Sequence, residues 1–118
     1  MGEVMNEKKH LYILWTNGDV EAAEKMVFMY GVNSLLKGWW EEVTIILWGG
    51  SAKLAAENET IKDLISKAVE SGVHISACRA CADMYGVAEK LEEQGIEVIY
   101  WGEQMTHLLK NNEKLLTI

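Results

Sequence analysis

Two cysteines, three positions apart, are the residues of this chain with the clearest chemical potential. They occur in the stretch Cys78-Arg79-Ala80-Cys81, and no other cysteine is present. In a reducing compartment such a pair serves chemistry more often than cross-linking, because the thiolate is a nucleophile and a redox group. Arg79, the single arginine of the chain, would add a positive charge beside the sulfur if its side chain folded back. The stretch predicts a reactive Cys78, with Cys81 either as a resolving thiol or as a small core residue.

The position of Cys78 along the chain supports this prediction. Residues 73–77 have the composition of a short strand, and apolar residues at helical spacing follow Cys78 until Gly95, with Gly86 dividing them. A thiol at a strand-to-helix junction meets free backbone N–H groups and the positive end of the helix dipole. Both favour the thiolate, so Cys78 is expected to be nucleophilic near neutral pH.

Other uses of the cysteine pair are weighed from the residues around it. Zinc normally takes four ligands, and only Cys78, Cys81 and His74 lie close in sequence, so no metal site is expected. A thioredoxin-type site needs a cis-proline, and the chain contains no proline. The glycine-rich phosphate motifs are absent, so no cofactor is expected. A dithiol redox or sensor protein using Cys78 and Cys81, or a non-catalytic module that binds a small molecule or partner, remains an alternative.

Size and charge limit the function further. The chain has 118 residues, 49% of them hydrophobic, and a formal net charge of −7, which disfavours a nucleic-acid partner. No apolar run approaches the roughly 20 residues of a membrane span. Residues 1–9 are polar and are expected to form a flexible segment without an export signal, so a cytoplasmic location is expected.

Short apolar runs alternate with helical patterns along the whole chain. Strands are expected at residues 11–15, 43–48, 73–77, 96–100 and 114–118, and helices at 19–37, 60–71, 79–94 and 104–110. The first strand is expected to be buried on both faces. Residues 51–59 form the longest expected loop, although their centre, which contains alanine and leucine, could form a helical turn. The alternation predicts one domain over residues 1–118, a three-layer α/β/α fold with a five-stranded, mainly parallel sheet.

Loops at the carboxyl ends of parallel strands form the functional crevice of such folds. These loops carry three tryptophans and several small residues, and their side chains are expected to line a pocket around Cys78: Trp15, Asn17, Gly18, Trp48, Gly49, Gly50 and Trp101. An aromatic wall would shelter a reactive sulfur from water and oxidants. The same aromatics could instead close the core or a subunit interface.

The order and spacing of these segments resemble the DsrE/DsrF-like family, which includes the DsrE and TusD sulfur-transfer subunits. The resemblance runs through residues 11–18, 43–50 and 60–72, the strand that ends at Cys78, and residues 86–98. It implies an intracellular sulfur-relay protein that carries sulfane sulfur as a persulfide on Cys78 and passes it from donor to acceptor proteins. It also implies a symmetric homo- or hetero-oligomer, often a trimer or hexamer, and a homo-oligomer is expected here. Cys81 and the tryptophan-rich rim are departures from the relay subunits. The chain looks more like a small single-gene branch of the family. The resemblance therefore implies the site but not the pathway.

Overall fold

A single five-stranded sheet organises the protein. The computed structural model describes residues 8–118; residues 1–7 of the expected N-terminal segment lie outside the described residues. The strands are ordered β4-β3-β2-β1-β5, and each neighbouring pair is parallel. Their bounds are β1 (His10–Trp15), β2 (Glu42–Leu47), β3 (His74–Cys78), β4 (Glu97–Ile99) and β5 (Lys114–Thr117). The predicted five-stranded parallel α/β fold is confirmed.

Helices connect the strands and lie on both faces of the sheet. Their bounds are α1 (Val20–Ala22), the π-helical segment η1 (Ala23–Phe28), α2 (Met29–Leu36), α3 (Gly50–Glu57), α4 (Glu59–Glu70), α5 (Arg79–Tyr85), α6 (Ala88–Glu93) and α7 (Gly102–Lys110). Gly86, with a φ of 69°, separates α5 from α6 at the predicted position. Within residues 8–118, no helix has the length and apolar character needed to cross a membrane.

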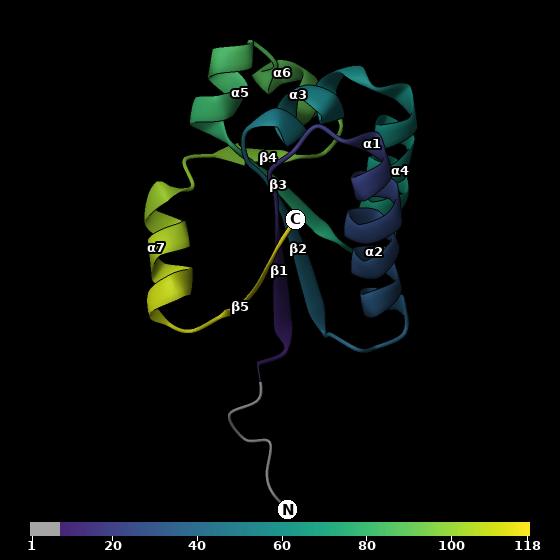
Figure 1. Cartoon of the computed structure of the whole chain (residues 1–118), viewed down its shortest axis with the longest axis vertical. Helices are drawn as coiled ribbons and strands as arrows, with labels where there is room; N and C mark the ends of the chain where they lie inside the picture. Colours follow the sequence, from purple (N-terminus) through teal and green to yellow (C-terminus); the bar gives the residue numbers. More distant parts are fainter. Residues whose placement is uncertain (1–7) are drawn as a thin grey trace, which may run out of the picture.

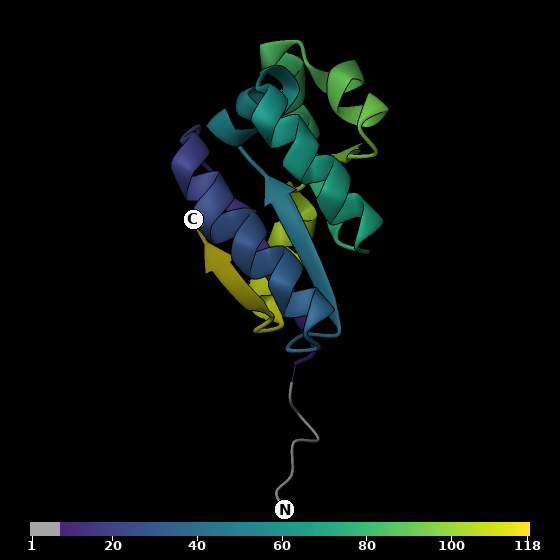
Figure 2. The same ribbon diagram turned by 90° about the vertical axis from the view of Figure 1, so that its right-hand side faces the viewer.

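The two faces of the sheet are covered unequally (Figure 1). The chain advances from β1 through β2 and β3 to β4, then returns to the far side of β1 to form β5. Because crossovers between parallel strands are right-handed, the first three connections lie on one face and the reversed connection lies on the other. Helices α1 to α6 therefore share one face, where α2 and α4 lie roughly along the direction of β2 (Figure 2), and α7 stands alone on the opposite face.

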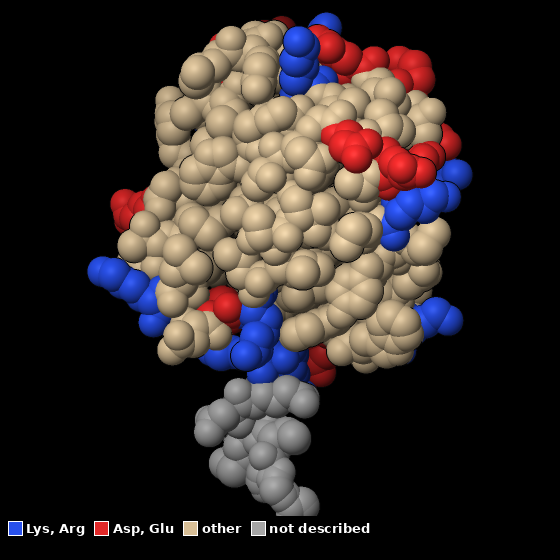
Figure 3. Space-filling view, viewed as in Figure 1, with Lys and Arg blue, Asp and Glu red and all other residues tan. Residues whose placement is uncertain are grey.

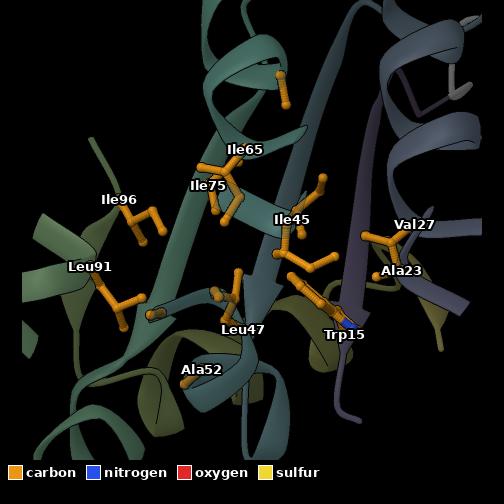
Figure 4. Close-up of a cluster of buried hydrophobic side chains, with 14 of the residues drawn as sticks. Trp15, Ala23, Val27, Ile45, Leu47, Ala52, Ile65, Ile75, Leu91 and Ile96 are labelled. Atoms are coloured by element: carbon orange, nitrogen blue, oxygen red, sulfur yellow. The ribbon is translucent and has the colours of Figure 1, made fainter. Parts of the chain in front are cut away.

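The main hydrophobic core lies between the sheet and helices α1 to α6 (Figure 4). Along β1, Leu11, Ile13 and Trp15 are buried in this core, whereas the residues between them are only partly buried. The prediction that this strand is buried on both faces is therefore wrong. A single helix on the second face cannot cover all five strands, so burial alternates with the pleat of the strand.

Two local predictions also differ from the structure. Residues 51–59 are mostly helical, forming α3, because small residues recur at helical spacing and allow close packing: Ser51, Ala52, Ala55 and Ala56 are buried. The next helix begins before Thr60. Asn58 caps it by accepting the backbone N–H of Ile61 at 3.0 Å, which leaves no separate loop between α3 and α4.

Candidate functional site

Cys78 lies where the sequence pattern places it, as the last residue of β3 and the N-cap of α5. Its side chain points to the face of the sheet that α7 covers. There it belongs to a small buried cluster with Ile46, Trp101 and Met105, and only 5% of Cys78 is exposed. Opening of this cluster is therefore required before a protein-sized reactant can touch the sulfur.

Cys81 lies one turn into α5 and is partly exposed, and both cysteines are free thiols. Its Sγ accepts the backbone N–H of Gly49 at 3.3 Å. Burial raises the pKa of the Cys81 thiol; the Gly49 N–H opposes this shift, and the charge and side-chain hydrogen bond of Cys78 add to it. Cys81 is therefore protonated at neutral pH, and its S–H can donate to Cys78.

The ionisation of Cys81 can be measured directly through its alkylation. In the unmodified protein, the rate of iodoacetamide reaction at Cys81 is expected to rise with pH around a pKa above the ordinary value of about 8.5. In Cys78→Ser this pKa is expected to fall but to stay above that value, because burial remains while the charge of Cys78 is gone. Peptide mass spectrometry across a pH series checks both. An ordinary pKa in the unmodified protein would contradict the role of burial.

Arg79 does not take the predicted place beside the sulfur. Its Nη2 donates to the backbone carbonyl of Val98 at 3.1 Å and lies 3.4 Å from Oε2 of Glu92, while Nη1 lies 3.8 Å from Oδ1 of Asp83. A carbonyl and two carboxylates thus hold the guanidinium. Arg79 ties α5 to α6 and β4, and we correct its predicted role accordingly.

The predicted aromatic wall is divided between the two faces of the sheet. Trp48 and Trp101 pack in the cluster that contains Cys78. Trp15 is fully buried in the main core, with its ring edge-on to Phe28 at 5.4 Å between centroids (Figure 4). The reason is the alternation of β1, which points Trp15 to the same face as Ile13. Trp15 therefore does not line a pocket around Cys78.

The small residues of the rim are divided in the same way. Gly18 and Gly50 line a hollow of about 320 Å³ beside α3, with Lys53, Leu54, Glu57 and Asn58. Asn17 accepts the backbone N–H of Asp19 at 3.0 Å in a local turn. Gly49 is the rim glycine whose N–H contacts a thiol, that of Cys81, and its φ is 77°. A Cβ there would lie 3.3 Å from the Thr16 carbonyl oxygen, so the tight passage requires glycine.

A row of polar side chains on the α7 face was not anticipated from the sequence. The Trp101 indole N–H donates to Ser76 Oγ at 2.7 Å, and Ser76 donates to Oε1 of Glu97 at 2.8 Å. His74 and Ser76 alternate with apolar residues in β3, which is the signal of a strand with one polar face. Among residues 8–118, no group of three or more metal-binding side chains is gathered for a metal ion.

Comparison with known proteins agrees with this architecture. The DsrE/DsrF-like family matches residues 9–118. BT1422 of Bacteroides thetaiotaomicron, a conserved protein of unknown function, is 40% identical with a TM-score of 0.93, over 98% of this chain and 100% of that one.

More distant structures share the fold. MTH1491 of Methanobacterium thermoautotrophicum has a TM-score of 0.74 at 12% identity, over 92% of this chain and 98% of its own. The ychN protein of E. coli has a TM-score of 0.68 at 12% identity, over 94% and 99%. No match was found among proteins of curated function. The family match spans nearly the whole described chain, and the chain therefore belongs to the DsrE/DsrF-like family.

Proposed function

We propose that this protein is a sulfur carrier, in which Cys78 holds sulfane sulfur as a persulfide and passes it to a thiol of a partner protein. The family is associated with sulfur relay in general. The observation that carries the proposal is the pairing of Cys78, at a strand-to-helix junction, with a second thiol whose pKa is raised. In this pair Cys78 is the proposed attacking thiol, and Cys81 supplies a hydrogen bond to it.

The transfer is balanced without an added oxidant, reductant or cofactor. The Cys78 thiolate attacks the outer sulfur of a donor persulfide; a bond forms between the two sulfur atoms as the donor's S–S bond breaks, and the donor leaves as a thiolate. In the second half, an acceptor thiolate attacks the outer sulfur now on Cys78. The Cys78 thiolate is released, and the acceptor carries the persulfide.

The burial of Cys78 suits a carrier of an oxidisable group. Its neighbours Ile46, Trp101 and Met105 are apolar and exclude water from the sulfur. A persulfide extends the side chain by one S–S bond of about 2.05 Å, which the closed cluster must make room for. Loading and delivery therefore require a transient opening, and closure afterwards protects the loaded sulfur.

Loading can be tested on the full chain without an identified partner. After treatment with a small persulfide donor and removal of excess reagent, intact mass is expected to show one additional sulfur atom per chain. Addition of an acceptor thiol is expected to remove it. Failure of the native chain to gain sulfur at any donor concentration would rule out the carrier function.

A second function is favoured by the contact between the two thiols. Thiols this close can form a reversible disulfide, as in a dithiol redox or sensor protein. This function needs both cysteines equally, whereas a carrier needs only Cys78, so single substitutions separate the two.

We further propose that the protein is a homo-oligomer, trimeric or hexameric. The edge of β5 and the adjoining helical segment expose apolar side chains, including Met26, Met29, Tyr30 and Leu116. Figure 3 shows this face, where few charged side chains lie over β5 between α7 and α2. A groove of about 500 Å³ runs between Tyr30 and Leu116. An unpaired, apolar sheet edge is typical of a surface that another chain covers.

Substitution at the edge strand tests this assembly. Leu116→Lys is expected to shift the protein to a smaller species, because burying a lysine in an apolar interface is costly. Light scattering after size exclusion measures the mass. Leu109→Lys is the control, since Leu109 is exposed on α7 outside the groove. An unchanged mass for Leu116→Lys, or a monomeric native protein, would contradict the proposal.

A further inference from the structure

A row of polar side chains, joined by hydrogen bonds and one close His–carboxylate pair, crosses the α7 face of the sheet and ends at Trp101. Trp101 donates to Ser76, and Ser76 donates to Oε1 of Glu97, which lies 3.2 Å from His74 Nε2. The row of side chains continues from His74 Nδ1 to Thr44 Oγ1 at 3.3 Å and from there to His10 Nε2 at 2.7 Å. The row links residues of the four adjacent strands β1, β2, β3 and β4 to Trp101, the N-cap of α7.

The direction of each hydrogen bond near Trp101 follows from the groups involved. An indole nitrogen can only donate, so Ser76 Oγ accepts it and must direct its own proton to the Glu97 carboxylate. Oε1 of Glu97 therefore accepts the Ser76 proton, and His74 Nε2 lies 3.2 Å from the same oxygen. The other ring nitrogen of His74, Nδ1, forms a hydrogen bond with Thr44 Oγ1 at 3.3 Å. The Ser76 hydroxyl thus both accepts and donates, and Glu97 orients it toward Trp101.

Trp101 is the residue at which this row of polar side chains meets the cluster around Cys78. It is 3% exposed and belongs to the same buried cluster as Cys78. It is also the N-cap of α7, and Met105 and Leu108 of that helix pack on the same cluster. The indole therefore fixes both the cover over Cys78 and the start of the helix that lies on that face.

We propose that Ser76 and Glu97 are positioning residues that hold Trp101 as a gate over Cys78 and so set how often the thiol is reached. This inference rests on the proposed function, because a gate over Cys78 is useful only if a sulfur donor must reach the thiol. The side chains of Glu97 and His74 are 45% and 50% exposed, so the outer part of the anchor lies in reach of solvent or of a docked protein. Trp101 is therefore buried, whereas the residues at the far end of its hydrogen-bonded support, Glu97 and His74, are accessible from outside.

The experiment measures Cys78 accessibility without using sulfur. In a Cys81→Ser background, where Cys78 is the single thiol, Ser76→Ala and Glu97→Ala are expected to raise the iodoacetamide rate at Cys78 roughly five- to tenfold. Glu97→Gln keeps an acceptor oxygen for Ser76 and is expected to restore most of the slow rate. The indole N–H signal of Trp101 in ¹⁵N NMR is expected to lose its hydrogen-bonded shift in Ser76→Ala and Glu97→Ala only.

A matched serine provides the control. Ser34 is also fully buried, lies in α2 on the other face, and its hydroxyl has no hydrogen-bond partner among the described residues. Ser34→Ala is expected to leave the Cys78 rate and the Trp101 signal unchanged. An unaltered rate in both Ser76→Ala and Glu97→Ala, or an equal rise in Ser34→Ala, would overturn the gate. Should Ser76→Ala fail to fold, the comparison of Glu97→Ala with Glu97→Gln decides.

The outcome is separable from that of the proposed function. Absence of sulfur loading together with faster alkylation in the anchor variants would remove the carrier function and keep the gate. Normal loading with unchanged alkylation would remove the gate alone.

Discussion

Replacement of Cys78 by serine is expected to abolish sulfur loading, whereas replacement of Cys81 by serine is expected to leave it in place. A serine hydroxyl does not ionise near neutral pH and cannot attack a persulfide in this setting. Cys81 is expected to be a poor substitute for Cys78, because burial raises the pKa of its thiol and keeps it mostly protonated at neutral pH. Loss of Cys81 removes one hydrogen bond to Cys78, so the loading rate of Cys81→Ser should stay within about tenfold of the native rate.

Intact mass after treatment with the same persulfide donor, followed over time, measures both variants. Circular dichroism of each variant confirms that the fold is retained. Loading of Cys78→Ser would show that Cys81 is the carrying thiol. Complete loss in both single variants would instead support the dithiol function, in which neither cysteine acts alone.

The parts of the site that the sequence predicts are those determined by local pattern. The strand before Cys78 and the helix after it each have their own periodicity, so the junction could be located from residues 73–91 alone. Gly86 and Gly49 likewise occupy positions with positive φ, which glycine adopts readily. Local patterns suffice here because backbone conformation depends mainly on near neighbours.

The parts that the sequence does not predict depend on which face each residue meets. Trp15 and Trp48 end similar strands, yet Trp15 lies in the main core and Trp48 beside Cys78. Strand alternation and crossover handedness together decide this, and they require the sheet order. Arg79 is likewise captured by Val98, which is 19 residues away in sequence. Contacts of this range cannot be inferred from spacing.

The unequal covering of the sheet also explains how a stable protein can hold a site that must open. Helices α1 to α6 enclose the large core on one face, and this core supplies most of the stabilising burial. The cluster around Cys78 is small and is covered by the single helix α7. Local opening on that side exposes the sulfur without loss of the main core, as expected for regions of low local stability.

Two neighbouring isoleucines in β2 test this division. Ile45 and Ile46 are both fully buried but point to opposite faces, Ile45 into the main core and Ile46 into the cluster of Cys78. Ile45→Ala is expected to lower the free energy of unfolding by about 4 kcal/mol, because the packed helices cannot collapse into the cavity. Ile46→Ala is expected to cost about 2 kcal/mol, because α7 can settle into the space.

Urea denaturation measures these free energies, and the alkylation rate of Cys78 in a Cys81→Ser background measures the local effect. Ile46→Ala is expected to raise the Cys78 rate strongly, since it loosens the cluster that buries the sulfur. Ile45→Ala is expected to leave that rate nearly unchanged while the protein remains folded, because the two clusters are separated by the sheet. A larger rise in the Cys78 rate for Ile45→Ala than for Ile46→Ala would show that the main core governs access to the sulfur. That result would contradict opening of the site on the α7 side alone.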